Sequence, residues 1–282
     1  MNSVNNASNS IKSEPMRYRN IASIMTSEVL TINPENTLHE AAQLMGEKHI
    51  GSLIVVKYET PVGIITEGDV ISVATEGIPL QRGWISSSPS IRNEKVEKFM
   101  SFPLVKICVE CQLKDVARMM LEKRVQRLGV CNSVDLVGII TTSDMIGSLP
   151  QVPEIMKPWF EVDNFMSKQV VTADEGMLLE EVAQIMAENH VGSVIVTSEG
   201  EPTGIFTERD LLTKFLAKDK SLVEEVGDVC SSPLVTAPIG ISAHDAAEIM
   251  IEKHIKRLPI TQEGKLVGVL SARDLVEAYA RG

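Results

Sequence analysis

The chain has 282 residues, 44% of them apolar, which is enough to bury a sizeable core and to form about two domains. Its 27 basic and 38 acidic side chains give a net charge of −11 at pH 7, and such a field repels nucleic acid and anionic membranes. We therefore expect neither partner, and an anionic ligand would have to be held by local cations.

Targeting and disulfide signals indicate the compartment in which the protein resides. The first residues lack the apolar stretch of a signal peptide, and no run reaches the roughly 18 to 20 apolar residues of a membrane span. Cys108, Cys111 and Cys131 lie close together in the sequence and Cys230 lies far from them, which is no disulfide framework. We expect a cytoplasmic protein.

The chain begins with residues 1–18, rich in Asn and Ser, which we interpret as a mobile tail. The next segment, 19–74, predicts a short strand at 29–32 and a helix with an apolar stripe from Leu38 to Met45. Thr37 and Glu40 form a possible capping box for that helix. Strands at 51–56 and 62–65 and a closing helix from Val70 follow, so the unit is predicted to be β-α-β-β-α.

This unit occurs four times. An apolar strand that ends in Thr or Ser, with Asp three residues later, recurs at Asp69, Asp144, Asp210 and Asp274, each 44 residues after an equivalent start. Equal intervals indicate one duplicated structural unit. The sequence therefore predicts a mixed α/β (α+β) fold of four repeats, at 19–74, 94–148, 160–218 and 219–282.

A single unit of this size is marginal as an independent domain, so we expect the repeats to pair. The first and third share a His-x-Gly-Ser segment at 49–52 and 190–193, and the second and fourth share Arg-Leu at 127–128 and 257–258, which suggests a doubled pair. Residues 149–159, with proline at 150, 153 and 158, make a reasonable linker. Residues 75–93 are an insertion that we interpret as a surface loop, the alternative being a cleft cover or partner contact.

The four segments that end at Asp69, Asp144, Asp210 and Asp274 resemble CBS motifs, the cystathionine-β-synthase repeat, arranged as two tandem pairs known as Bateman modules. The resemblance extends from about Ile21 to the last residues. It implies a regulatory protein with adenosine-containing ligands in the clefts between paired repeats. Catalytic members of the family carry active sites in separate domains, and no segment is left over here for one.

The resemblance therefore implies a non-catalytic sensor of AMP, ADP or ATP that requires no other cofactor. It also implies flat, disc-like assembly, either within one chain or through a homodimer, and leaves room for a regulated protein partner. A ligand-free structural scaffold remains an alternative, as does the ligand-binding subunit of an enzyme or transcription complex. An enzyme is the weakest interpretation.

The repeated Asp has a chemical rationale. A carboxylate after a strand and at a helix start can accept hydrogen bonds from both ribose hydroxyls. The hydroxyl three residues earlier can bond phosphate or sugar, and it belongs to Thr66, Thr141, Thr207 or Ser271. The same pair is also an ordinary N-cap, which we would favour for a single copy; four copies reverse that preference.

By resemblance, each cleft combines the Asp of one repeat with the strand start of its partner. Two clefts gain a cation there, namely Asp69 with Val125, Gln126 and Arg127, and Asp210 with Ile255, Lys256 and Arg257. Two do not, namely Asp144 with Ile50, Gly51 and Ser52, and Asp274 with Val191, Gly192 and Ser193, although Arg273 can compensate in the last. We rank the Asp210 cleft first, because Arg209 adds a third cation, and the Asp69 cleft second. A solvated charged face is the alternative for these cations.

Other candidates have simpler explanations. Basic residues at one helical C-terminus, His49, Arg124, His190 and His254, fit the negative end of the helix dipole better than a metal site. The C-x-x-C pair at 108–111 resembles a zinc or redox motif but lacks a second pair or a fourth ligand. We expect no metal there, and Cys111 to line the Asp69 cleft.

Overall fold

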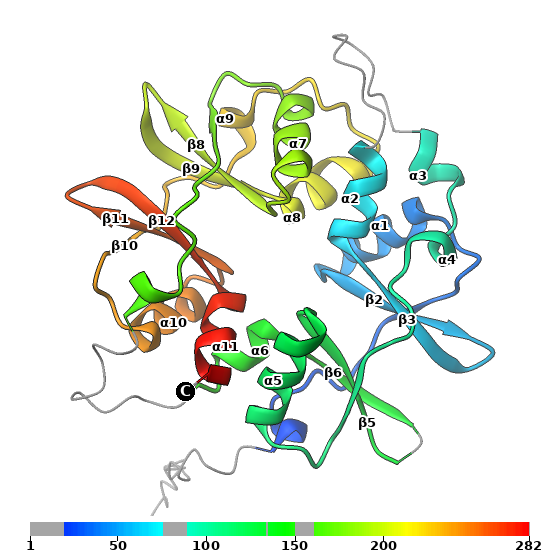
Figure 1. Cartoon of the computed structure of the whole chain (residues 1–282). Helices are drawn as coiled ribbons and strands as arrows, with labels where there is room; N and C mark the ends of the chain where they lie inside the picture. Colours follow the sequence, from blue (N-terminus) through cyan, green and yellow to red (C-terminus); the bar gives the residue numbers. More distant parts are fainter. Residues whose placement is uncertain (1–19, 76–88, 134, 150–160, 282) are drawn as a thin grey trace, which may run out of the picture.

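The computed structural model describes residues 20–75, 89–133, 135–149 and 161–281. The expected tail at 1–18 and nearly all of the expected linker at 149–159 lie outside these residues. Within them, the chain forms four three-stranded sheets with their helices, arranged around a common centre (Figure 1). No described helix is long and apolar enough to cross a bilayer.

Repeat 1 confirms the predicted order. After η2 (Ile21–Ser23) come β1 (Thr31–Ile32), α1 (Leu38–Lys48), β2 (Ser52–Lys57), β3 (Thr60–Thr66) and α2 (Glu67–Thr75). The strand β1 runs parallel to β2, and β2 pairs antiparallel with β3, so β2 is the central strand. Antiparallel pairing through a tight hairpin brings the start of β2 next to the end of β3, where the closing helix begins.

The other repeats follow the same plan. Repeat 2 contains α4 (Val96–Phe99), β4 (Lys106–Cys108), α5 (Leu113–Lys123), β5 (Arg127–Cys131), β6 (Leu136–Thr141) and α6 (Thr142–Ile146). Repeat 3 contains η4 (Val162–Asn164), β7 (Thr172–Asp174), α7 (Leu179–Glu188), β8 (Ser193–Ser198), β9 (Glu201–Thr207), and α8 (Glu208–Asp210) continued by η5 (Leu211–Phe215) and η6 (Leu216–Lys218). Repeat 4 contains α9 (Val226–Val229), β10 (Ala237–Pro238), α10 (Ala243–Glu252), β11 (Arg257–Gln262), β12 (Lys265–Ser271) and α11 (Ala272–Arg281).

The first helix of each repeat buries its predicted apolar stripe, which in α1 is Leu38, Ala41, Ala42 and Met45. The capping box is confirmed, because the Thr37 N–H donates to Glu40 Oε2 at 2.7 Å. Such a cap contributes about 1 kcal/mol.

The repeats pair by exchanging their leading segments. Thr26, near the start of repeat 1, bridges Ile139 in β6, while Ser101, near the start of repeat 2, bridges Ile64 in β3. The second pair repeats the exchange, with Ser167 against β12 and Ser231 against β9. We call repeats 1 and 2 the first pair and repeats 3 and 4 the second pair.

The two pairs lie side by side within one chain and contact each other (Figure 1). Repeat 1 meets repeat 3, since α1 contacts η5 and η6, and repeat 2 meets repeat 4, since α11 contacts α5 and α6. One core joins repeats 1 and 3 and a second joins repeats 2 and 4. The apolar faces that a lone pair would expose are thus buried against the other pair.

The insertion at 75–93 differs from a plain loop where it is described. Residues 89–93 form α3 (Pro89–Asn93), which packs on α1 and α2 and buries Ile91. Arg92 reaches Asp219, at the start of repeat 4, with 2.7 Å between Nη2 and Oδ1. Residues 76–88 of the insertion lie outside the described residues.

Candidate functional site

The four repeated Asp side chains all cap their closing helices. In each repeat the N–H and the hydroxyl of the Thr or Ser donate to Oδ2 of the Asp, at 2.8 and 2.7 Å for Asp69 and at 3.0 and 2.6 Å for Asp210. Asp144 and Asp274 repeat this geometry within 2.7 to 2.8 Å. The N-cap interpretation is therefore correct at all four positions. It is compatible with a ligand, because the cap uses Oδ2 and leaves Oδ1.

The Thr and Ser hydroxyls of the four repeats differ from the expectation that they bond phosphate or sugar. Each donates its single proton to the Asp beside it, so a hydroxyl such as that of Thr207 can donate to phosphate only if the cap opens. The Asp carboxylates and the cations thus remain as the polar ligand-binding groups. At Asp210 the second oxygen also has a partner, since Lys214 Nζ lies 2.7 Å from Oδ1.

The Asp210 cleft brings together every side chain expected there. A cavity of about 230 Å³ is lined by Thr207, Arg209, Asp210, Ile255, Lys256 and Arg257. Ile205 adds apolar surface, and Glu67 of repeat 1, Glu208, Ser231 and His254 complete the polar wall. This cleft therefore holds three carboxylates, those of Glu67, Glu208 and Asp210, and three cations.

The Asp274 cleft is also assembled as expected and holds more charge than expected. Val191, Gly192, Ser193, Ser271, Arg273 and Asp274 line a cavity of about 430 Å³. Gln126, Lys256 and Arg257 line it too. The strand start at 191–193 supplies no cation, as expected, but the neighbouring strand start at 256–257 does.

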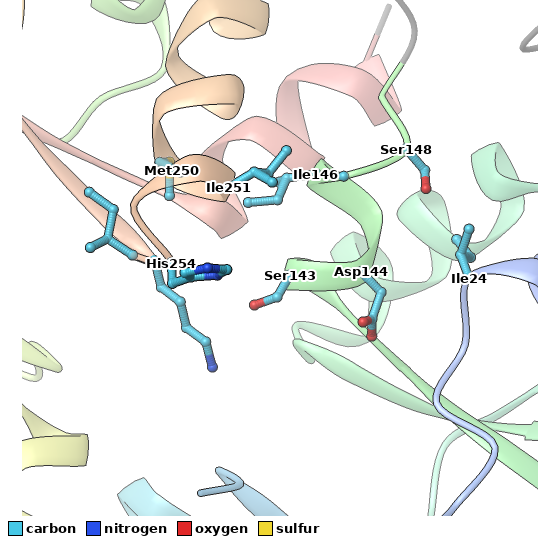
Figure 2. Close-up of a pocket in the computed structure, with 11 residues that line it drawn as sticks. Ile24, Ser143, Asp144, Ile146, Ser148, Met250, Ile251 and His254 are labelled. Carbon is cyan, nitrogen blue, oxygen red and sulfur yellow. The ribbon is translucent and has the colours of Figure 1, made fainter. Parts of the chain in front are cut away.

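The Asp144 region is divided between two cavities. Thr141 lies with Ile50, Gly51 and Ser52 around a cavity of about 150 Å³, which Arg127 and Lys256 also line. Asp144 itself lines a different cavity, of about 480 Å³, between repeats 2 and 4. Figure 2 shows Ser143 and Asp144 on one side of it and Met250, Ile251 and His254 on the other. Asp144 is thus separated from its expected partners, and residues of the second pair line its cavity instead.

Asp69 lies near the cation predicted for it. Burial raises the pKa of this carboxyl, and hydrogen bonds from Thr66 and the charge of Arg127 oppose that rise. The other two residues expected in the Asp69 cleft, Val125 and Gln126, share contacts with their repeat 4 counterparts, Ile255 and Lys256. Val125 packs against the core of repeats 2 and 4, and Gln126 lines the Asp274 cleft.

A cluster of charged side chains lies where the two pairs meet. Arg209 Nε donates to Oε1 of the buried Glu67 at 2.9 Å, which joins repeat 3 to repeat 1. A Cβ on Gly51 would lie 2.8 Å from both Arg127 Nη2 and Glu67 Oε2, so a larger residue here would force these groups to shift. Gly192 has the same role beside Arg257 and Glu208, whose side chains a Cβ would overlap.

The cluster shifts the pKa values of its members. Burial lowers the pKa of the Arg127 and Arg257 guanidinium groups and raises the pKa of the Glu208 carboxyl. Lys256 reaches solvent where the clefts open, yet burial and the charge of Arg209 lower its pKa to about 8. Cations that are partly desolvated and crowded by like charges favour an anion among them.

Sequence reasoning missed two kinds of residue here. Glu67 and Glu208 were not predicted, although each directly follows the Thr that caps its helix. The strand register was also overlooked, because it places Arg127 beside Thr141 and Arg257 beside Ser271. Each arginine therefore serves its own repeat's cleft as well as its partner's, a result that the hairpin length would have predicted.

The secondary candidates are placed as follows. His190 and His254 each adopt a left-handed backbone just after a helix, and both line clefts, which the helix-dipole explanation did not anticipate. Burial raises the pKa values of Cys111 and Cys131, which favours the thiol form. Cys111 packs against the core of repeats 2 and 4. Among the described residues, no group of three or more potential ligands is arranged to hold a metal.

The comparisons with curated proteins give relatives that match most of this chain or a part of it. Protein MJ1404 of Methanocaldococcus jannaschii is 26% identical over 275 residues, which cover 92% of this chain and 62% of MJ1404. Protein MK0525 of Methanopyrus kandleri is 34% identical over 113 residues, 39% of this chain and 58% of MK0525. The chain thus spans roughly three fifths of the length of these two relatives.

Among solved structures, protein MJ1225 of M. jannaschii, proposed as an archaeal homologue of γ-AMPK, matches with a TM-score of 0.72 and 21% identity over 93% of this chain and 100% of its own. A conserved protein from Pyrococcus horikoshii matches with a TM-score of 0.62 and 22% identity over 92% and 99%. These two likenesses concern the fold.

The CBS domain model matches residues 21–76, 96–151, 162–217 and 226–281. The chain therefore belongs to the CBS-domain family and carries four copies of the domain.

Proposed function

We propose that this protein is a non-catalytic regulator that binds an adenine nucleotide, AMP, ADP or ATP, with the Asp210 cleft as its main site. The observation that carries the proposal is the convergence of Asp210 with Arg209, Lys256 and Arg257 around one cavity. A nucleotide needs a hydrogen-bond acceptor for its ribose, cations for its phosphate and apolar surface for its base, and this cleft offers all three.

Each part of the nucleotide has a group to meet it. Ile205 and Ile255 supply apolar surface for the base. The ribose hydroxyls would donate to Asp210 Oδ1, taking the place of the Lys214 ammonium, which now lies 2.7 Å from that oxygen. The three cations then surround the phosphate, and arginine suits this task because its planar fork binds phosphate oxygens in pairs.

Regulation follows from the position of Arg209. Its guanidinium joins the two pairs through Glu67, so a phosphate that engages Arg209 competes with a carboxylate of the other pair. A ligand shifts an arrangement only through different affinities for two arrangements, and this exchange supplies such a difference. We propose that occupancy is passed to a regulated protein as a change in how the pairs meet.

The relatives are consistent with this proposal. MJ1225 is 28% identical to this chain over 218 residues, and its proposed kinship with γ-AMPK fits an adenine nucleotide as the ligand class. An unoccupied scaffold is the alternative in which the same cations only serve to join the pairs.

Calorimetry of AMP, ADP and ATP tests the proposal. The variant Asp210→Asn with Arg257→Gln keeps an oxygen for the helix cap but removes one acceptor charge and one cation. We expect its main dissociation constant to rise at least tenfold, about 1.4 kcal/mol. The matched control is Asp115→Asn with Arg118→Gln, an exposed pair on α5 with 3.7 Å between Nη1 and Oδ1. Equal affinities in wild type and both variants, or no heat with any nucleotide, would reject the proposal.

A further inference from the structure

Lys256 occupies a position that no other cleft residue shares. It lines the Asp144 cavity, the Thr141 cavity, the Asp210 cleft and the Asp274 cleft. Among the described residues around these four cavities, it is the one side chain common to all of them. The clefts of both pairs therefore meet at a single ammonium group.

The backbone at Lys256 is tied to the closing helix of its own repeat. The Ala272 N–H donates to the Lys256 carbonyl at 3.0 Å, which ties the start of β11 to the start of α11. In the first pair the equivalent bond runs from the Thr142 N–H to the Gln126 carbonyl, also at 3.0 Å. Gln126 is thus the counterpart of Lys256, and its uncharged side chain breaks the symmetry between the two pairs.

The charges around Lys256 make it receptive to an anion. Arg209, Arg127 and Arg257 all act on it repulsively, and Glu67 is the carboxylate that opposes them. A phosphate in any of the clefts would relieve this repulsion. A second phosphate in another cleft would find the ammonium already engaged and a like charge beside it.

We infer that Lys256 is an anion ligand shared by the Asp144, Asp210 and Asp274 clefts, so that these clefts compete for one cation and bind nucleotides anticooperatively. The inference rests on the proposed function and adds a coupling between sites to it. Coupling between two sites commonly changes an affinity by about 5-fold to 150-fold. We expect about tenfold here, because the Asp210 and Asp274 clefts each keep an arginine of their own, Arg209 and Arg273.

The coupling has a counterintuitive signature that calorimetry can measure. Asp210→Asn removes AMP binding at the strongest cleft. The dissociation constant for AMP at the remaining clefts should then be about tenfold lower than that of the weaker binding step in wild type. Lys256→Gln introduces the residue found at the equivalent position 126. In this background, Asp210→Asn should change the dissociation constant of the weaker binding step by less than about twofold. This thermodynamic cycle isolates the part of the coupling that passes through Lys256. An unchanged melting temperature in Lys256→Gln shows that the cluster remains folded.

The outcomes separate this inference from the function on which it rests. A tightened weaker step that needs Lys256 supports shared binding, and so does a step that appears only after Asp210→Asn. If wild type shows two or more AMP-binding steps and Asp210→Asn leaves their dissociation constants unchanged, the shared role of Lys256 is overturned, although the protein still binds nucleotide. A tightening that persists in Lys256→Gln would assign the coupling to another group. No AMP binding in wild type would remove both proposals together.

Discussion

Glu67 is the carboxylate on which the junction between the two pairs depends. Its side chain is 11% exposed and bonds Arg209, whose side chain is 39% exposed. The charge of Glu67 also acts favourably on Arg127, Lys256 and Arg257. Replacing it by Gln keeps the shape and a hydrogen-bond acceptor but leaves the cations without this compensation.

The expected loss of stability follows from this partial exposure. Removing one partner of a fully buried ion pair costs about 3–5 kcal/mol, whereas an exposed pair contributes about 0–1 kcal/mol. With Glu67 buried and Arg209 partly in water, we expect Glu67→Gln to lower the free energy of unfolding by about 1–2 kcal/mol. For a chain of this length that corresponds to a melting temperature roughly 2–8 °C lower.

Thermal unfolding with and without AMP is the assay. A bound phosphate restores negative charge to the cluster, so the deficit of Glu67→Gln should shrink by about half or more at saturating AMP. The matched control is Glu122→Gln, which removes an exposed carboxylate on α5 and should change the melting temperature by less than 1 °C or so. The reasoning would be refuted by a variant as stable as wild type, or by a deficit that AMP leaves unchanged.

Three further predictions concern pH, packing and capping. The pKa of Lys256 is about 8 in the folded protein, against an ordinary value of 10.5, and a bound phosphate favours the protonated form. AMP affinity should therefore fall as the pH rises from roughly 7 to 9, with proton uptake on binding that calorimetry in buffers of different ionisation enthalpy detects; a flat profile would contradict this. Gly192→Ala should lower the free energy of unfolding by about 1–3 kcal/mol in urea titrations, because its Cβ would overlap Glu208 and Arg257, while Gly176→Ala, whose nearest atom is 3.5 Å away, should differ little. Thr37→Val should cost about 1 kcal/mol by the same measurement, and no loss would show that the capping box is dispensable.

The fold was predictable because it is repeated. One helix stripe such as that from Leu38 to Met45 is weak evidence, but four at equal spacing define the unit and its order of elements. Pairing could also be anticipated, since a unit of this size needs a partner. The packed helix within the insertion was not predicted, because its burial of Ile91 depends on contacts with α1 and α2 that form only on folding.

The site was predictable only in part. The Asp positions and the cations at 127 and 256–257 follow from the repeat, and the structure brings Asp210 together with its expected partners. Which carboxylates face those cations was not predictable, because Glu67 meets Arg209 only when repeat 1 lies against repeat 3. The role of Gly51 was hidden for the same reason, since the groups that fill the space beside it come from three different repeats.

A crystal structure of the protein grown with saturating AMP tests the central claim most directly. The account predicts density for one nucleotide in the Asp210 cleft, with ribose hydroxyls on Asp210 and the phosphate within hydrogen-bond distance of at least two of Arg209, Lys256 and Arg257. An empty Asp210 cleft at that concentration, or a nucleotide bound outside the clefts between repeats, would contradict it.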